Sequence, residues 1–391
     1  MNKRSHGEGS ISKRANGSWL GQVTIDGKRV SKTFRIRKDA QDWINSTTRQ
    51  VKQGLTYEST RTTVDELLTE WLKMKTSNSR PSTGEQYRRM ARLYISPVLG
   101  GVKLQELSPV KIQALYRDLE ASGTGKRTVE LVHTVIHGFL AHALKMGYVA
   151  QNWAVMVEVP RPEKSEMAVW DESQVSRFLT MFRDDPFYRL VFATGMRRGE
   201  LIGLQWKDVD WKTGMIHVRR QVYHPEGGGF IFQPPKTERG KRAIRLGTGL
   251  LEALRKHYQE TVPLMKAIAG NDWQEYDLVF PSSKGTPRNG YNVSKAFHDA
   301  AELAGLPVIR FHDIRHTAAS IMLLHGEPPV RVAAILGQSV AILLSTYAHY
   351  IQDDQERASQ LMDEITTVTA IDLNDCITLH QNSAIEYQKT A

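Results

Sequence analysis

The chain has 391 residues, of which 40% are hydrophobic and 24% are charged. This composition is typical of a globular protein, and the length favours two or three domains. No apolar run approaches the ~20 residues of a membrane span, and the first residues, "MNKRSHGEGS", predict no secretory signal. The single cysteine, Cys376, excludes an internal disulfide framework and a zinc finger, and it suits a reducing cytoplasm.

The net charge of +10 is concentrated near the N-terminus. Residues 1–57 carry a net charge of +8 and residues 58–165 carry +4, whereas residues 166–391 carry −2. Such a concentration of basic residues indicates a polyanionic partner, and nucleic acid is the first candidate. The alternative is a soluble protein with a basic tail.

Residues 1–57 predict a three-stranded sheet followed by a helix over about 38–53. The strands are expected in "GSISKRA", "SWLGQVTI" and "KRVSKTFR", joined at Asn16-Gly17 and Asp26-Gly27. Asn-Gly and Asp-Gly favour tight hairpin turns because both turn residues need positive φ. A sheet of this size can enter the major groove of DNA, and its candidate contacts are Lys28, Arg29, Lys32 and Arg35. The alternative is a solvated hairpin whose basic residues prevent edge-to-edge aggregation.

Residues 62–156 predict an all-helical domain of four helices. In "TVDELLTEWLKM" one helical face is apolar, with Leu67, Leu68, Trp71 and Leu72. A later helix is expected to begin after Ser108 as N-cap, with Pro109 at its first position, and to stop at Gly123. Basic residues on these helices would suit a DNA clamp, although most helical charges are simply solvated: Arg88, Arg89, Lys126 and Arg127.

Residues 157–170, "VEVPRPEKSEMAVW", are rich in proline and charge and have no periodicity, which predicts an interdomain linker. Residues 171–365 are expected to be mainly helical, with a small antiparallel sheet formed by "MIHVRRQVY", "GFIFQPPKT" and "KRAIRLG". The tail, residues 366–391, is polar apart from "IDLNDCITL", which predicts a short strand. The expected fold class is therefore multidomain α+β.

Four separated stretches after residue 171 hold the residue types that a phosphoryl-transfer site needs. "ATGMRRGELIGL" places an arginine just past a glycine turn, and "QPPKTERGKRAIRL" places a lysine near a hairpin turn. "RFHDIRHTAAS" sets a histidine and an arginine three residues apart, so that they share one face of a helix. "ILGQSVAILLSTYAHY" adds a glutamine and a tyrosine. The candidate site residues are Arg197, Lys236, His312, Arg315, Gln338 and Tyr347.

In this order and spacing, the stretches resemble the tyrosine recombinase family, and the phage integrases in particular. The most specific matches are "TGMRRGEL", "PKTERGKRAI", "HDIRHT" and "LGQS" followed by "TYAH". The resemblance extends over essentially the whole chain. It implies an arm-binding domain in residues 1–57, a core-binding domain in residues 62–156 and a catalytic domain in residues 171–365.

The resemblance also implies residue roles: Arg197 and Arg315 grip the scissile phosphate, Lys236 is the hairpin lysine, His312 is the catalytic histidine and Tyr347 is the nucleophile. Glu200 matches an acidic position that supports the active-site helix. Gln338 departs from the family, which usually has His and sometimes Trp there. Because a glutamine still donates a hydrogen bond, we expect Gln338→His to leave DNA cleavage intact or to improve it.

The chemistry of these residue types fits the family reaction. Two arginines can hold the charge that grows on an attacked phosphodiester. A tyrosine has an ordinary pKa of about 10, so it needs a proton acceptor, for which His312 is the candidate. Lys236 is the candidate acid for the departing 5′ oxygen. The 3′-phosphotyrosine stores the bond energy, so neither ATP nor a metal or other cofactor is expected.

Several assignments have competitors. Tyr350 lies one helical turn beyond Tyr347, Arg198 adjoins Arg197, and Lys241 and Arg239 lie close to Lys236. "HDIRH" is one residue short of a zinc-peptidase pattern, but its Asp is shorter than the required Glu and its Arg would repel a metal. A non-catalytic architectural DNA-binding protein would explain the charge but not the site residues. A relaxing topoisomerase would have no need for the basic N-terminal sheet.

We therefore expect a site-specific DNA recombinase that integrates, and also excises, phage or mobile-element DNA. The expected partners are double-stranded DNA at core and arm sites, three further copies in a homotetramer, a host DNA-bending protein and an excisionase-type directionality factor. No membrane is expected, and the location is the cytoplasm of a bacterial host, at the nucleoid.

Overall fold

The computed structural model describes residues 9–25, 27–52, 61–163 and 167–350, together with residues 359–360, 362–363 and 366. The predicted strand "IDLNDCITL", the rest of the tail after residue 366 and Asp26 of the second turn lie outside the described residues. The chain divides into two compact units. The first comprises residues 1–166 with 225–229, and the second comprises the remaining residues.

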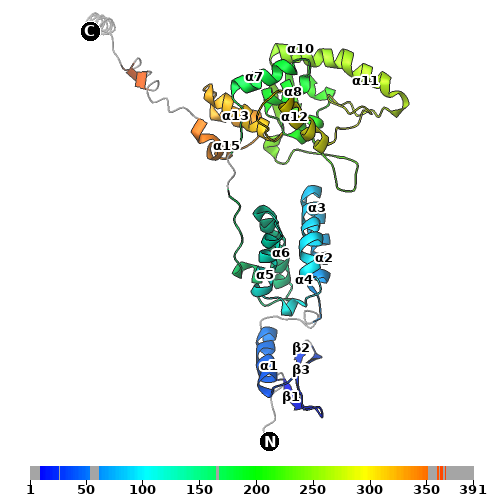
Figure 1. Cartoon of the computed structure of the whole chain (residues 1–391), viewed down its shortest axis with the longest axis vertical. Coiled ribbons are helices and arrows are strands. Elements are labelled where there is room, and N and C mark those ends of the chain that lie inside the picture. The colour runs from blue at the N-terminus through cyan, green and yellow to red at the C-terminus, as the bar shows by residue number, and fades with distance from the viewer. Residues whose placement is uncertain are drawn as a thin grey trace, which may run out of the picture. The chain divides into compact units, whose positions relative to one another are not determined.

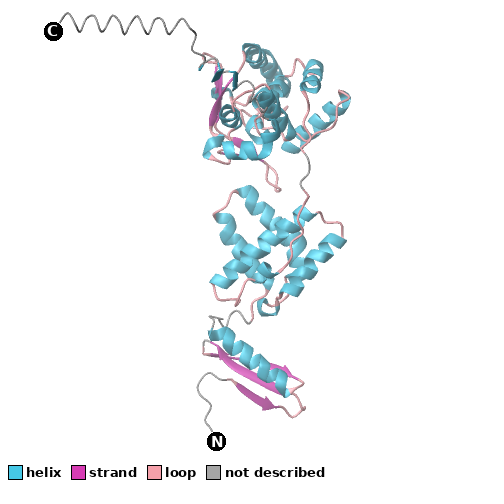
Figure 2. Cartoon of the chain, turned by 90° about the vertical axis from the view of Figure 1, so that its left-hand side faces the viewer, coloured by secondary structure: helices cyan, strands magenta, loops and turns pink. Residues whose placement is uncertain are grey.

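The predicted N-terminal sheet is confirmed as an antiparallel β1-β2-β3 sheet (Figure 2). Its elements are β1 (Ser10–Lys13), β2 (Trp19–Ile25), β3 (Lys28–Phe34) and the covering helix α1 (Arg37–Lys52). The two turns carry Gly17 at φ 82° and Gly27 at φ 75°, in the left-handed region that the turn motifs require. Val23, Ile25 and Ile44 form the buried contact between sheet and helix.

The rest of the first unit is helical, as expected. Its elements are α2 (Val64–Ser77), α3 (Pro81–Met90), a π-turn (Ala91–Ile95), α4 (Ser96–Leu99), a 3₁₀ turn (Leu104–Glu106), α5 (Pro109–Ala121), α6 (Lys126–Lys145) and a second 3₁₀ turn (Trp153–Met156). The predicted apolar face of α2 is buried in its core, with Leu67, Leu68, Trp71 and Leu72. Thr63 caps α2 through a reciprocal bond with Glu66.

One helix of this unit is longer than Pro97 suggests. The backbone passes from α3 through the π-turn into α4, and Ser96 N–H bonds to the carbonyl of Ala91, five residues back. A proline removes one helical hydrogen bond and crowds the preceding turn. The wider π-turn just before Pro97 accommodates this, so the helix continues to Leu99.

The second unit is mainly helical (Figure 1). Its elements are α7 (Glu172–Met181), α8 (Pro186–Thr194), α9 (Arg198–Ile202), a 3₁₀ turn (Trp206–Asp208), β4 (Val209–Asp210), β5 (Met215–Val218), β6 (Gln221–Tyr223), β7 (Ile231–Gln233), a 3₁₀ turn (Glu238–Gly240), β8 (Arg242–Arg245), α10 (Thr248–Lys256), a π-turn (His257–Thr261), α11 (Val262–Ala269), a 3₁₀ turn (Gly270–Asp272), α12 (Gly290–Leu303), α13 (Asp313–Leu324), α14 (Pro329–Leu336), α15 (Val340–Tyr347) and a last 3₁₀ turn (Ala348–Tyr350). The predicted mixed α+β class is confirmed.

The strands of the second unit form two small antiparallel sheets, β4-β5-β8 and β6-β7, rather than the single expected sheet. The expected strand "MIHVRRQVY" is interrupted at Arg219 and Arg220. Arg220 bonds to the buried carboxylate of Asp208. The backbone therefore leaves the first sheet at this pair and starts the second sheet at Gln221.

Trp170, the last residue of the expected linker, belongs to the core of the second unit. Its ring packs on Phe178, Phe192 and Phe297. Its backbone N–H donates to Thr317 Oγ1 at 3.1 Å, and Trp170 Nε1 donates to a backbone carbonyl at 2.8 Å. The linker prediction is therefore wrong at this end, because a proline-rich stretch without periodicity contains no mark of a buried side chain.

Within the described residues, no single helix is long and apolar enough to span a membrane. One pair, Pro329–Leu336 with Val340–Tyr350, meets the length and composition criteria only when joined, and it is bent by 108°.

Candidate active site

The turn between α8 and α9 places Arg197 at the site. Helix α8 ends at Gly195, whose φ of 57° is left-handed and whose added Cβ would lie 2.5 Å from Leu336. Arg197 then caps α9: its backbone N–H donates to Glu200 Oε2 at 3.1 Å, and its guanidinium donates to Glu200 Oε1 at 2.9 Å. The Gly-Met-Arg sequence thus holds Arg197 in a defined position, with its side chain 30% exposed.

Glu200 is a buried carboxylate held between two arginines. Its side chain is 1% exposed, and its second partner is Arg242, whose NH2 lies 3.0 Å from Oε2. Arg242 also donates to the carbonyls of Gly240 and Ile335, so that it joins β8, α9 and α14. Burial alone would raise the pKa of Glu200, but the two guanidiniums outweigh it and hold the pKa below its ordinary value.

Arg315 is the buried cation at the centre of the site. Its NH1 donates to the carbonyl of Gly195 at 2.9 Å, and its NH2 donates to Gln338 Oε1 at 3.0 Å. Among the described residues, no carboxylate lies within ion-pair distance of Arg315. Burial first, and then repulsion by Arg197 and Arg242, lower the pKa of Arg315 to about 9. The cluster has three guanidiniums and one carboxylate, so it holds excess positive charge suited to an anion.

Gln338 is the residue that departs from the family pattern, and its contacts show which hydrogen bonds its amide makes. It follows Gly337, which ends α14 with φ 67°, and its Oε1 faces Arg315. Because a guanidinium only donates, this bond determines which end of the amide is oxygen. Gln338 Nε2 is consequently a donor, and it is buried with no hydrogen-bond partner among the described residues. A buried donor beside an unpaired cation is a further contact for an anion.

Tyr347 ends α15 and is 2% exposed. Its ring belongs to a small apolar cluster that includes Leu323, Leu336 and Leu343. Its hydroxyl lies 2.6 Å from His316 Nδ1. Burial raises the pKa of Tyr347 to about 12, even though the charge of Arg315 acts in the opposite direction. The hydroxyl is therefore protonated at neutral pH.

The histidine that contacts the Tyr347 hydroxyl is His316, whereas the sequence predicts His312 as the proton acceptor. The ring of His312 lies edge-on to that of His316, with 5.4 Å between centroids. Desolvation first, and then the neighbouring His316 and two arginines, lower the pKa of His312 to about 4. Both histidines lie on the same helical face, one turn apart, and the structure turns the second toward the tyrosine.

The remaining candidates have different surroundings. Lys236 is exposed, on the segment between β7 and the 3₁₀ turn Glu238–Gly240. Its competitor Lys241 pairs with Glu238 at 3.0 Å, and its other competitor Arg239 is exposed. Arg198 donates to Ser294 on α12, unlike its neighbour in the cluster. Tyr350 packs on the rim of the apolar cluster.

The eight candidate DNA contacts are all exposed: Lys28, Arg29, Lys32, Arg35, Arg88, Arg89, Lys126 and Arg127. On α6, Arg127 pairs with Glu130 at 2.5 Å. Lys32 lies over the ring of Phe34, with its Nζ 5.9 Å from the centroid. Their contacts with DNA remain predictions.

Two residues of the cluster, Arg242 and His316, are not among the site residues predicted from the sequence. The first is in "KRAIRL", where alternation predicted a strand but did not show which arginine points inward. His316 enters the sequence-based predictions only as the last residue of "HDIRH", which does not match the zinc-peptidase pattern. The spacing of four residues between His312 and His316 places both on one helical face, and this was the sequence signal that could have identified His316.

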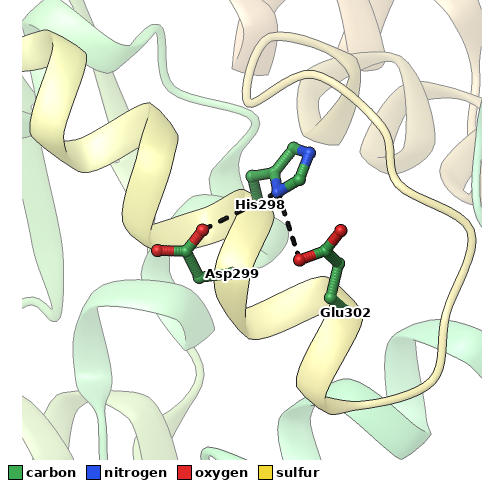
Figure 3. A group of neighbouring side chains, drawn as sticks. All are labelled: His298, Asp299 and Glu302. Atoms are coloured by element: carbon green, nitrogen blue, oxygen red, sulfur yellow. Dashed lines mark ion pairs between the residues drawn. The ribbon is translucent and has the colours of Figure 1, made fainter.

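A separate group on α12 consists of His298, Asp299 and Glu302 (Figure 3). The Nδ1 of His298 lies 3.7 Å from each carboxylate, and all three side chains are at least half exposed. Asp299 also pairs with Lys295 at 2.9 Å. The spacing along one helix is that of a solvated ion-pair network, so we assign no metal to it.

The chain is similar to known integrases and tyrosine recombinases. Residues 171–356 match the model of the phage integrase family, and residues 63–119 match that of the phage integrase N-terminal SAM-like domain. A XerC-like tyrosine recombinase of Caldanaerobacter subterraneus is 26% identical over 381 residues, covering 90% of this chain and 97% of that protein. The ICEBs1 integrase of Bacillus subtilis is 22% identical, covering 91% and 100%.

Two solved structures share the fold. The Tn1549 transposon integrase in complex with transposon right end DNA has a TM-score of 0.63 and 19% identity, covering 77% of this chain and 99% of that one. A lambda integrase dimer bound to a COC′ core site has a TM-score of 0.55 and 17% identity, covering 90% and 97%.

Replacing Glu200 by Gln is expected to lower the free energy of unfolding of the second unit by about 3 kcal/mol at pH 7, because it leaves Arg242 buried without a counter-charge. The folded-state pKa of Glu200 is lowered, so its contribution is present above the unfolded value of 4.5 and is lost as pH falls through the folded value. Urea unfolding should therefore show a difference that shrinks below pH 4.5.

The matched control is Glu238→Gln, which removes an exposed carboxylate paired with Lys241 and should change stability by less than about 0.5 kcal/mol. A Glu200→Gln difference that stayed the same at all pH values would contradict the buried ion-pair account.

Proposed function

The chain belongs to the phage integrase family of tyrosine recombinases, and from this premise we propose how its residues perform site-specific DNA recombination. The observation that carries the proposal is the buried Arg315, which has two hydrogen-bonded protein partners but no counter-charge among the described residues. A scissile phosphate would supply that negative charge.

In the proposed complex, the phosphate contacts Arg315, Arg197 and the Nε2 of Gln338. Each group donates hydrogen bonds, and the two arginines carry full positive charge, so they stabilise the charge that grows on phosphorus in the transition state. Glu200 is already paired with Arg197 and Arg242, which keeps it from competing for Arg315. These contacts need no metal to neutralise the phosphate.

Tyr347 is the proposed nucleophile. Its oxygen attacks phosphorus, the 5′ oxygen departs, and a 3′-phosphotyrosine joins the enzyme to one DNA strand. His312, at the start of α13, would contact the phosphate from the histidine position of the family, and Lys236 would protonate the leaving oxygen. Attack by another strand's 5′ hydroxyl reverses these steps and completes recombination without ATP.

The domains would divide the DNA between them. We assign residues 1–57 to arm sites, residues 62–156 and 171–365 to the core site on either side of the linker, and residues 366–391 to a tail that docks on a neighbouring subunit. The exposed basic side chains of β3 and of α3 and α6 support this assignment. They would contact phosphates, which position the protein without reading sequence.

The assembly would be a homotetramer on DNA, as in the lambda integrase tetramer bound to a Holliday junction, whose fold the chain shares at a TM-score of 0.54. Bridging arm and core sites requires bent DNA. A host DNA-bending protein and an excisionase-type factor are therefore proposed partners, and the bacterial nucleoid is the proposed location.

The first test is a covalent-adduct assay in EDTA. Purified protein is mixed with nicked duplexes from the DNA that flanks its gene and is then denatured in SDS. Wild type and Tyr350→Phe should form an SDS-resistant adduct, whereas Tyr347→Phe should form none. An adduct that persists in Tyr347→Phe would contradict the nucleophile assignment. Salt-sensitive binding without any adduct would favour an architectural DNA-binding protein instead.

Gln338 provides a second test in the same assay. Gln338→His keeps an acceptor for Arg315 and a donor for phosphate, so cleavage should be unchanged or faster. Gln338→Leu removes both and should slow single-turnover cleavage about 10²–10³-fold. Complete loss of cleavage in Gln338→His, or normal cleavage in Gln338→Leu, would contradict the proposed contact.

A further inference from the structure

We propose that His316 accepts the proton of the Tyr347 hydroxyl during DNA cleavage, so that the two histidines of "HDIRHT" have different tasks. This inference rests on Tyr347 being the nucleophile. The observation that carries it is the 2.6 Å separation between Tyr347 Oη and His316 Nδ1, across two helices 31 positions apart in the sequence.

The contact has the geometry of a proton-transfer pair. The atoms are already within the range required of a general base and its nucleophile. The hydroxyl lies in an apolar cluster, and its one hydrogen bond among the described residues is to His316. A protonated phenol donates its only hydrogen, so Nδ1 is the acceptor and the ring's own hydrogen is on Nε2.

Burial, rather than the neighbouring charges, is the main cause that favours the neutral, proton-accepting form of His316. Burial lowers its pKa first, and Arg315 and Arg310 add to this effect, whereas Asp313 opposes it. Asp313 accepts three hydrogen bonds from Arg310, which limits its influence. Among the described residues, the titratable rings that lie against His316 are those of His312 and Tyr347, and Tyr350 in turn acts on Tyr347.

His312 is poorly placed for the same task. Its ring meets the edge of His316, and its side chain is exposed. It lies at the N-terminal end of α13, whereas His316 lies one turn further in, under the tyrosine. His312 is therefore accessible for a contact with DNA, whereas His316 contacts the proposed nucleophile, Tyr347.

The atoms balance without any added reagent. The Tyr347 O–H bond breaks as Nδ1–H forms, Oη bonds to phosphorus, and the bond from phosphorus to the 5′ oxygen breaks with proton donation from Lys236. His316 is then an imidazolium. On rejoining, a 5′ hydroxyl attacks phosphorus and passes its proton to the neutral amine of Lys236, while the bond from phosphorus to Oη breaks and Oη regains its proton from His316.

The test is single-turnover adduct formation by His316→Asn, whose amide oxygen takes the place of Nδ1 as an acceptor but does not take up a proton. Two nicked substrates are compared, one ordinary and one with sulfur in place of the scissile 5′ oxygen, since a thiolate leaves without a proton. His316→Asn should be slowed about 100-fold or more on both. Lys236→Ala should recover on the sulfur substrate alone.

The pH profile supplies the second readout. On the sulfur substrate, wild-type cleavage should fall in acid as His316 becomes protonated, below the ordinary histidine range, and this fall should be absent in His316→Asn. His325→Asn, at the C-cap of the same helix and bonded to Glu172, is the control and should resemble wild type. Gel-shift binding shows that each variant is folded, and His316→Gln is used where the first variant does not bind.

Three outcomes would overturn the inference: cleavage by His316→Asn within a few-fold of wild type, recovery of that variant on the sulfur substrate, or faster cleavage, which would make the contact a resting-state lock. An adduct in Tyr347→Phe is a different result, because it would refute the nucleophile assignment itself.

Discussion

The site depends on one constraint, the burial of Arg315 without a carboxylate partner in the part of the chain that the structure describes. A guanidinium in that position costs folding free energy unless its donors are satisfied and an anion arrives. The left-handed Gly195 offers it a carbonyl, and Gln338 offers it an amide oxygen. Glu200, the nearest compensating charge, is held by other arginines. The positive charge of Arg315, unpaired among the described residues, is the proposed binding site of the phosphate, and α8, α13 and α14 are arranged around it.

The same helix that buries the cation also contacts the proposed nucleophile. Arg315 and His316 are consecutive on α13: Arg315 bonds to Gln338 beside the proposed phosphate position, and His316 bonds to Tyr347. Because α14 and α15 pack on α13 through Leu336 and Leu343, a shift of α13 would move both groups together. The packing of α13 against α14 and α15 gives a physical reason why "HDIRHT" and "LGQS" with "TYAH" lie close together in space. The proposed phosphate contact and the proposed proton acceptor therefore belong to one packed unit.

Much of this arrangement follows from local sequence signals. Asn-Gly and Asp-Gly turns, the apolar face of α2 and the glycine before Arg197 each act over a few residues, and the structure has those elements where they were expected. What local signals miss depends on distant partners. Trp170 is buried because of Thr317 and Phe297, and Arg242 points inward because of Glu200. Likewise, only the packing of α15 on α13 decides which histidine meets the tyrosine.

The most direct test of the central claim is to remove the phosphate charge that Arg315 is held to neutralise. A nicked substrate with a methylphosphonate at the scissile position is neutral there, and the rate of adduct formation is measured for wild type and Arg315→Ala on both substrates. The account predicts that Arg315→Ala is severely slowed on the ordinary phosphodiester and regains much of its rate on the neutral one. An equal defect on both substrates would mean that Arg315 has a structural task only, and the account would be wrong.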